Sequence, residues 1–129
     1  MRKLSIAIIM LASFVLTGCG GDSAENVAKD MVANLNEMAS ILTSVTDEAS
    51  AKAAVPKIEA VREKMRECAK RAKAVGKVDA ATETKINEMM QAGMTQAMQS
   101  IAVAQERLAA QPQLMAIIQP AMQGMENDL

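Results

Sequence analysis

Apolar side chains recur along this chain at alternating spacings of four and three residues, and this pattern limits the fold more than any other feature. The first run is Val27, Met31, Leu35, Met38, Leu42 and Val45. The second is Ala54, Ile58, Val61, Met65, Cys68, Ala72 and Val75, and the third is Ile86, Met90, Gly93, Ala97, Ile101, Ala104 and Leu108. Such spacing places one apolar seam along a helix, as in coiled coils. It predicts three long helices, over about 23–45, 47–76 and 82–110.

Composition favours the same fold class. Half of the 129 residues are hydrophobic, yet only 1% are aromatic and 12 are Met. Ala, Met and Leu favour helices, whereas strands favour aromatic and β-branched residues. We therefore predict an all-α fold, namely an elongated antiparallel bundle or coiled coil of three long helices. Helical spacing from Leu114 to Met125 adds a short C-terminal helix, interrupted by Pro120.

Several residues mark the expected helix ends. Asp22 with Glu25 three residues later resembles the capping pattern that begins a helix, and Thr46 is expected to cap the second helix. Pro56 lacks the N–H that the carbonyl of residue 52 needs, so it predicts a kink or a short separate turn over 47–55. Pro112 is expected to stop the third helix.

The first 16 residues have the pattern of an export signal. Arg2 and Lys3 precede an apolar stretch over residues 4–16. A charged start followed by a short apolar segment is typical of a secretory signal peptide. As a helix, the apolar stretch would be about 20 Å long, too short to cross a bilayer comfortably.

The residues that follow, Leu16-Thr17-Gly18-Cys19, resemble the lipobox of bacterial lipoproteins. The resemblance implies cleavage between Gly18 and Cys19, a diacylglycerol on the Cys19 thiol and an acyl group on the new N-terminus. The chain would then comprise a signal peptide (1–18), a lipidated tether (19–22) and one helical domain (23–129). Since Gly20, not Asp, follows the cysteine, the resemblance also implies the periplasmic face of the outer membrane in a bacterium with two membranes. Several acyl chains give stable anchorage.

A second, shorter resemblance lies in the domain itself. Residues 45–61 are similar to a stretch of uncharacterised small helical bacterial lipoproteins, for which no activity is known. The resemblance therefore implies no function beyond lipid anchorage.

Composition excludes several kinds of chemistry. The chain has no His, so imidazole catalysis and the usual zinc sites are excluded. The formal charge of −1 becomes −3 when Arg2 and Lys3 are removed, which disfavours nucleic acid as a partner. We expect no enzyme and no cofactor apart from the lipid. The preferred hypothesis is a structural or protein-interaction module of the cell envelope, with a protein partner or self-association.

Three sets of residues are candidate sites. Met89, Met90, Met94 and Met98 offer soft thioether ligands, so a binder of Cu(I), Ag(I) or another small ligand is the alternative function; the same residues can simply fill an irregular core. Once Cys19 carries lipid, Cys68 has no second cysteine in the chain with which to form a disulfide. It is either a small buried residue or one half of a disulfide between two copies.

The third candidate is a basic strip in the second helix. It consists of Arg62, Arg66, Lys70, Lys73 and Lys77. Such residues can bind a polyanion or lipid head groups. The competing interpretation is that the basic residues beside the seam pair with acidic residues of neighbouring helices and so select which helices pack together.

Overall fold

The computed structural model describes residues 23–125, and four helices make up most of this part of the chain. They are α2 (Ala24–Ser44), α3 (Glu48–Val75), α4 (Ala80–Ala109) and α5 (Pro112–Met122), and residues 23–125 contain no strand. The prediction of an all-α bundle with three long helices and a short fourth is confirmed, with the long helices beginning and ending within two residues of the expected positions.

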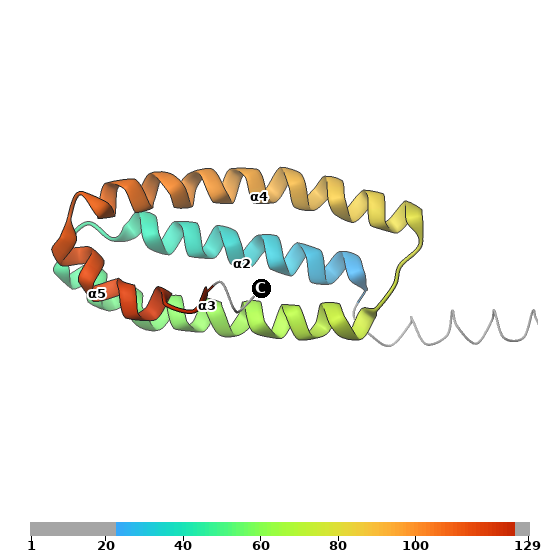
Figure 1. Ribbon diagram of the computed structural model, residues 1–129, viewed down its shortest axis with the longest axis horizontal. Helices are drawn as coiled ribbons and strands as arrows, with labels where there is room; N and C mark the ends of the chain where they lie inside the picture. Colours follow the sequence, from blue (N-terminus) through green and yellow to red (C-terminus); the bar gives the residue numbers. More distant parts are fainter. Residues whose placement is uncertain (1–22, 126–129) are drawn as a thin grey trace, which may run out of the picture.

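The three long helices lie side by side along the long axis of the molecule, and the chain reverses direction at each connection (Figure 1). α2 and α4 therefore run in the same direction, and α3 runs in the opposite one. α2 packs against both α3 and α4, whereas α5 packs mainly on α3. The central helix of the fold is thus the first one in the described chain.

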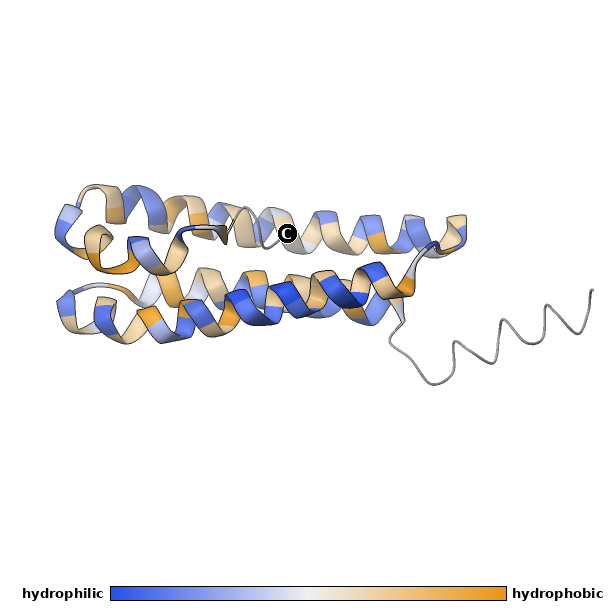
Figure 2. Ribbon diagram, turned by 60° about the horizontal axis from the view of Figure 1, so that its bottom comes forward, coloured by the Kyte–Doolittle hydropathy of each residue, from blue (hydrophilic) through white to orange (hydrophobic). Residues whose placement is uncertain are grey.

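The central position of α2 determines which residues form the core. α2 buries residues on two flanks of its seam, because it faces two neighbours: Val27, Ala28, Asn34, Leu35, Met38, Ala39, Ile41 and Leu42. α4 has one such neighbour along most of its length and buries only Ala97, Ala104 and Leu108. Side chains without solvent exposure gather at the end that α5 covers, among them Ile58, Val61 and Ile118. Figure 2 shows α3 at the front, with apolar and hydrophilic residues alternating along it.

Side chains cap three of the helix N-termini. Ser23 Oγ accepts a hydrogen bond from the Asn26 N–H at 3.1 Å, so Ser23, not Asp22, is the N-cap of α2. Asp47 caps α3 in a reciprocal pair with Ser50, one residue after the expected Thr46. Asp79 accepts from the Thr82 N–H at 2.8 Å and begins α4 before the expected residue 82. A short polar side chain that can reach the N–H three residues later fixes each start.

The three prolines occupy different helix positions. α3 is one continuous helix through Pro56, so the separate turn considered for 47–55 does not form; the kink stays a prediction. α4 ends at Ala109, just before Gln111 and Pro112 as expected, and Pro112 is also the first residue of α5. Proline suits the first helical turn, where its missing N–H would have no helical partner. Pro120 lies inside α5 and does not interrupt it.

The C-terminal end of α2 depends on a residue of another helix. The last turn of α2 holds no basic side chain. Arg107 of α4 supplies one: its Nη2 lies 3.1, 3.0 and 2.9 Å from the carbonyl oxygens of Leu42, Thr43 and Val45. A guanidinium at this end satisfies carbonyls that lack helical partners and favours the negative end of the helix dipole. Arg107 therefore fixes the register of α4 against α2.

Candidate interaction surfaces

The lipobox, the cleavage position between Gly18 and Cys19 and the tether lie outside the described residues. The bundle begins at Ser23, four residues after Cys19. Within residues 23–125, no helix is long and apolar enough to cross a bilayer.

Two basic residues of α3 bind acidic residues of α2. Lys64 Nζ lies 2.7 Å from Glu37 Oε2, and Arg71 Nη1 lies 2.9 Å from Asp30 Oδ2. The expectation that bases beside the seam pair with a neighbouring helix is confirmed for these two. Such exposed pairs contribute little stability, about 0–1 kcal/mol each, but they oppose other helix registers.

The five residues of the predicted basic strip do not form one continuous surface for an anion. Arg62 Nη1 donates to the carbonyl oxygen of Ala121 in α5 at 2.8 Å. Arg66 and Lys70 lie 3.1 and 3.7 Å from Glu63 and Glu67 on their own helix. The remaining two, Lys73 and Lys77, are exposed at the last turn of α3 and just beyond it.

The four methionines proposed as metal ligands divide between opposite sides of α4. Met89 and Met98 are nine residues apart, which is half a revolution on a helix at 3.6 residues per turn. Met98 is 54% exposed, whereas Met94 packs against the core. Met90, Met94 and Met98 follow one another at one-turn intervals and share a side of α4, whereas Met89 lies apart from these three. The described residues also contain no group of three His, Cys, Asp or Glu side chains placed to hold a metal.

Cys68 is buried, with 2% of its surface exposed, and Asn34 Nδ2 donates to its Sγ at 3.4 Å. Burial raises the pKa of the Cys68 thiol above its ordinary value of 9.0, so the unreactive neutral form is favoured. A disulfide between two copies would require α2 and α3 to separate around it. That disulfide stays a prediction.

A hollow of about 690 Å³ lies beside Cys68 between α2 and α3. Its charged lining residues are Asp30, Glu63, Lys64, Glu67 and Arg71, and the ion pairs of α3 with α2 cross it. Each of these charges has an ion-pair partner of opposite sign, so the hollow offers no unpaired charge to a ligand.

A further surface, on α4, was not among the candidates predicted from the sequence. Residues 89–105 contain no Asp, Glu, Lys or Arg, yet much of this segment faces solvent. Met98 and Val103, 54% and 68% exposed, are the large apolar side chains most exposed on it. The uncharged run was visible in the sequence, but its exposure depends on α3 and α5 leaving the outer side of α4 uncovered. We call the exposed side of residues 89–105 the uncharged α4 face.

A second apolar feature lies at the end where α2 begins. A hollow of about 230 Å³ is lined by Ala24, Val27, Ala28, Met31, Ala72, Val75, Gly76, Val78 and Ile86. These residues come from α2, from α4, from the end of α3 and from the loop after it. The hollow remains because α5, with 11 residues, covers only the other end of the bundle.

No protein-family model, no curated protein and no solved structure matches this chain.

Proposed function

We propose that this chain is a non-enzymatic, lipid-anchored module of the cell envelope that presents the uncharged α4 face to a protein partner. The single observation that carries the proposal is a helix surface about 25 Å long that is exposed and has no charged residue. We take the long helices to pack as an antiparallel coiled coil that holds this surface rigid.

Interface physics supports the choice of this face. The centres of protein–protein interfaces are depleted in charged residues and enriched in Met. Methionine side chains also adapt to partners of different shape. Small residues such as Ala92 and Ala102 allow a partner helix to approach closely. By contrast, the exposed side of α3 carries paired charges that a partner would have to desolvate.

Anchorage is the second part of the proposal. The motif Leu16-Thr17-Gly18-Cys19 supports acylation of Cys19, and Gly20 supports the periplasmic face of an outer membrane. Replacement of Cys19 by Ala is expected to abolish labelling with a radioactive fatty acid in growing cells. Unchanged labelling of the variant would contradict anchorage at this residue.

The partner face is tested by photo-crosslinking in intact cells. A photoreactive amino acid replaces Met98 on α4 in one variant and the exposed Glu59 on α3 in the control. We expect a discrete adduct from position 98 that is absent from position 59. An adduct of twice the chain mass would identify a second copy as the partner. The absence of any adduct at 98, or equal adducts at both positions, would contradict the proposal.

A competition variant sharpens this test. Val103→Lys places a charge on the uncharged α4 face without touching the core, because Val103 is 68% exposed. It should reduce the yield of the adduct at position 98 several-fold, while Lys57→Glu on α3 should leave the yield unchanged.

A further inference from the structure

We propose that the end of the bundle at which α2 begins docks directly on the lipid bilayer, with the α3–α4 loop in the head-group region. The occupant of this surface is the bilayer that holds the lipid anchor. The inference rests on the proposed function only through acylation of Cys19, and it adds an orientation: the bundle stands on the membrane on this end.

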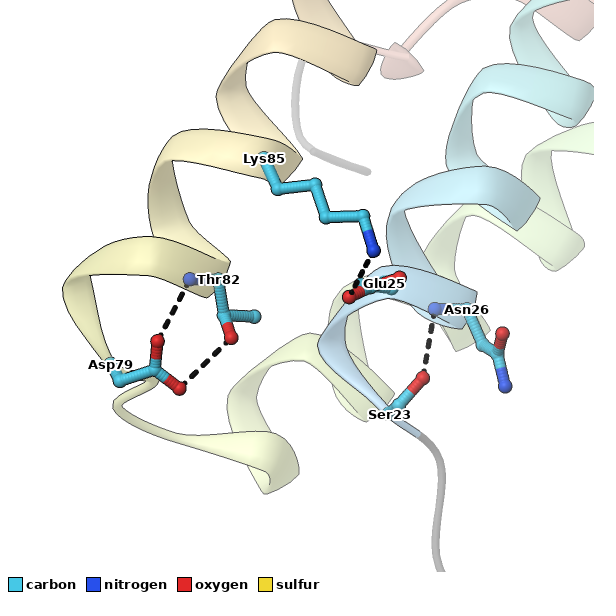
Figure 3. Close-up of polar contacts among 6 residues, drawn as sticks. All are labelled: Ser23, Glu25, Asn26, Asp79, Thr82 and Lys85. Carbon is cyan, nitrogen blue, oxygen red and sulfur yellow. Dashed lines mark hydrogen bonds and ion pairs between the residues drawn. The ribbon is translucent and has the colours of Figure 1, made fainter.

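The geometry begins with three chain segments that meet at one end. The start of α2, the end of α3 and the start of α4 lie together there, on the right in Figure 1. Lys85 Nζ lies 3.0 Å from Glu25 Oε1 and joins the second turn of α4 to the first turn of α2 (Figure 3). The four residues from Cys19 to Ser23 span at most about 14 Å when fully extended. A lipid on Cys19 therefore holds this end within head-group distance of the bilayer.

The surface at this end is apolar where a bilayer would touch it. Every residue that lines the 230 Å³ hollow is Ala, Val, Met, Ile or Gly. Val75 and Val78 flank the turn at Gly76, whose φ of 72° reverses the chain between α3 and the loop. Both valines remain partly exposed, so the turn presents apolar groups at the surface of this end. Apolar side chains at the head-group boundary are typical of proteins that lie on a membrane.

Two lysines at the same end are available to lipid head groups. Lys73 and Lys77 are exposed, and neither forms an ion pair with another described residue. Among the acidic residues here, Glu25 binds Lys85, and Asp79 bonds the N–H and hydroxyl of Thr82 at 2.8 and 2.9 Å, as Figure 3 shows. Asp79 and Glu83 are both exposed and neither forms an ion pair within the described part of this end, so their charges offset those of the two lysines. Lys73 and Lys77 can still contact anionic lipid head groups directly.

The opposite end lacks these features. Its α2–α3 loop leads into Asp47 and Glu48, and Glu48 is paired with Lys52. The hollow there includes polar and acidic residues such as Thr46 and Asp47. The end at which α2 begins therefore differs from this one in its wholly apolar hollow and its two unpaired lysines.

The absence of tryptophan from the chain provides a clean test. Val78→Trp places a single fluorophore in the α3–α4 loop, and Thr46→Trp places a matched one at the opposite end. The full acylated protein, its lipid verified by mass spectrometry and its helicity by circular dichroism, is reconstituted in vesicles of equal parts phosphatidylglycerol and phosphatidylcholine. We expect Val78→Trp fluorescence to shift to shorter wavelength, to be quenched by brominated lipid and to be several-fold less accessible to iodide than Thr46→Trp.

A second pair of variants tests whether the lysines contribute to membrane contact. Lys77→Glu should reduce the quenching of the Val78→Trp fluorophore by brominated lipid, whereas Lys57→Glu, at an exposed position of α3 far from this end, should not.

Equal iodide access at positions 78 and 46 in verified acylated protein would overturn the inference and leave the anchor intact. Equal lipid quenching at both positions would also overturn it, because the bundle would then lie flat. Absence of the lipid would instead refute the proposed function.

Discussion

Gly93 lies in the middle of α4 because α2 leaves no room for a side chain there. A methyl group on its Cα would meet both methyl groups of Val32, with Cγ2 only 2.9 Å away. A residue that weakens an isolated helix thus permits the close approach of α2 and α4. Protein cores are packed so densely that one extra carbon at such a contact changes the stability of the fold.

Gly93→Ala is therefore expected to destabilise the protein. Alanine is better than glycine in a helix by about 1 kcal/mol, but overpacking costs about 1–3 kcal/mol. The expected net result is a loss of about 1 kcal/mol in the free energy of unfolding, measured by urea denaturation followed at the helical circular dichroism band. The second change Val32→Ala should recover stability in the Gly93→Ala background. A single variant more stable than the wild type would show that the contact is loose.

At the level of the helices, Pro56 is a defect in α3. It lies in the ninth position of a continuous helix, where it cannot donate to the carbonyl four residues earlier. Its side chain is exposed, so it contributes little to the core. The helix persists because the buried residues on both sides of Pro56, Ala54 and Ile58, pack against the other helices.

Pro56→Ala should stabilise the protein by about 1–2 kcal/mol. The helix regains a hydrogen bond and loses the clash of the proline ring with the preceding turn, together worth up to about 3 kcal/mol in an interior position. Part of the gain is offset by greater freedom of the unfolded chain. Pro112→Ala is the matched control and should give no gain, since proline suits the first turn of α5. The measurement is the midpoint of thermal unfolding, and equal gains from both changes would contradict this explanation.

The N-caps make the stability of α3 and α4 depend on pH. Hydrogen bonds from the Ser50 N–H and hydroxyl lower the pKa of Asp47 below its ordinary 3.8, and those from Thr82 lower the pKa of Asp79 in the same way. A carboxyl whose pKa is lower in the folded state contributes stability that is fully present above its unfolded pKa. That contribution is lost as the pH falls through the folded pKa.

We expect the free energy of unfolding to decline as the pH falls below about 3.8, partly through these two caps. The double variant Asp47→Asn/Asp79→Asn should keep most of its stability at neutral pH, because Asn also caps helices. Its decline in acid should be shallower than that of the wild type, as measured by urea denaturation at a series of pH values. Parallel acid profiles for the two proteins would show that other carboxyls dominate.

On the scale of the whole molecule, α5 decides which part of the bundle has a closed core. Leu114, Ile118 and Ala121 are buried against the core, and Arg62 holds the end of α5 through the carbonyl of Ala121. The end of the bundle beyond α5 keeps Val75, Val78 and Ile86 partly exposed. One half of the molecule is therefore a filled core, and the other half carries an apolar hollow.

A chain that ends at Gln111 should lose cooperative unfolding. Removal of α5 exposes core residues such as Ile58, Val61 and Leu108, and truncation of even one buried Ile costs about 2–5 kcal/mol. We expect strong binding of a hydrophobic dye and a broad thermal transition. Ile118→Ala should show a milder loss than the truncation, and Gln119→Ala on the exposed side of α5 should behave as wild type. A sharp transition in the truncated chain would show that the long helices suffice.

The sequence predicted the individual helices well because the signals for them are local. The seam residues Leu35, Met38 and Leu42 are buried as expected, and so are Ile58 and Val61. The N-caps of α2 and α3 are Ser23 and Asp47, each one residue after the predicted Asp22 and Thr46. Both residues of each neighbouring pair have side chains that can cap a helix, so the sequence does not distinguish them. The predicted burial of the seam was wrong at the end without α5. Ala72 has the right spacing but is exposed, because no helix covers it.

The candidate surfaces were less predictable. Charge pattern indicated that bases of the second helix pair with acidic residues, yet it could not name Glu37 and Asp30 as the partners of Lys64 and Arg71. The uncharged run over 89–105 is plain in the sequence, but only the packing shows that it faces solvent. The four methionines looked like one group until a continuous helix placed Met89 and Met98 on opposite sides.

By itself the sequence determined the helical class and the extent of each helix, because these depend on residues close together in the chain; the export and lipidation signal stays a prediction of the sequence. Tertiary structure decided that α2 is central, that α5 closes one end and that an apolar hollow with two lysines lies at the other. Those outcomes depend on contacts such as Gly93 with Val32 and Arg107 with the end of α2, which join residues about 60 positions apart. No local pattern specifies them, since they arise from which surfaces fit when whole helices pack.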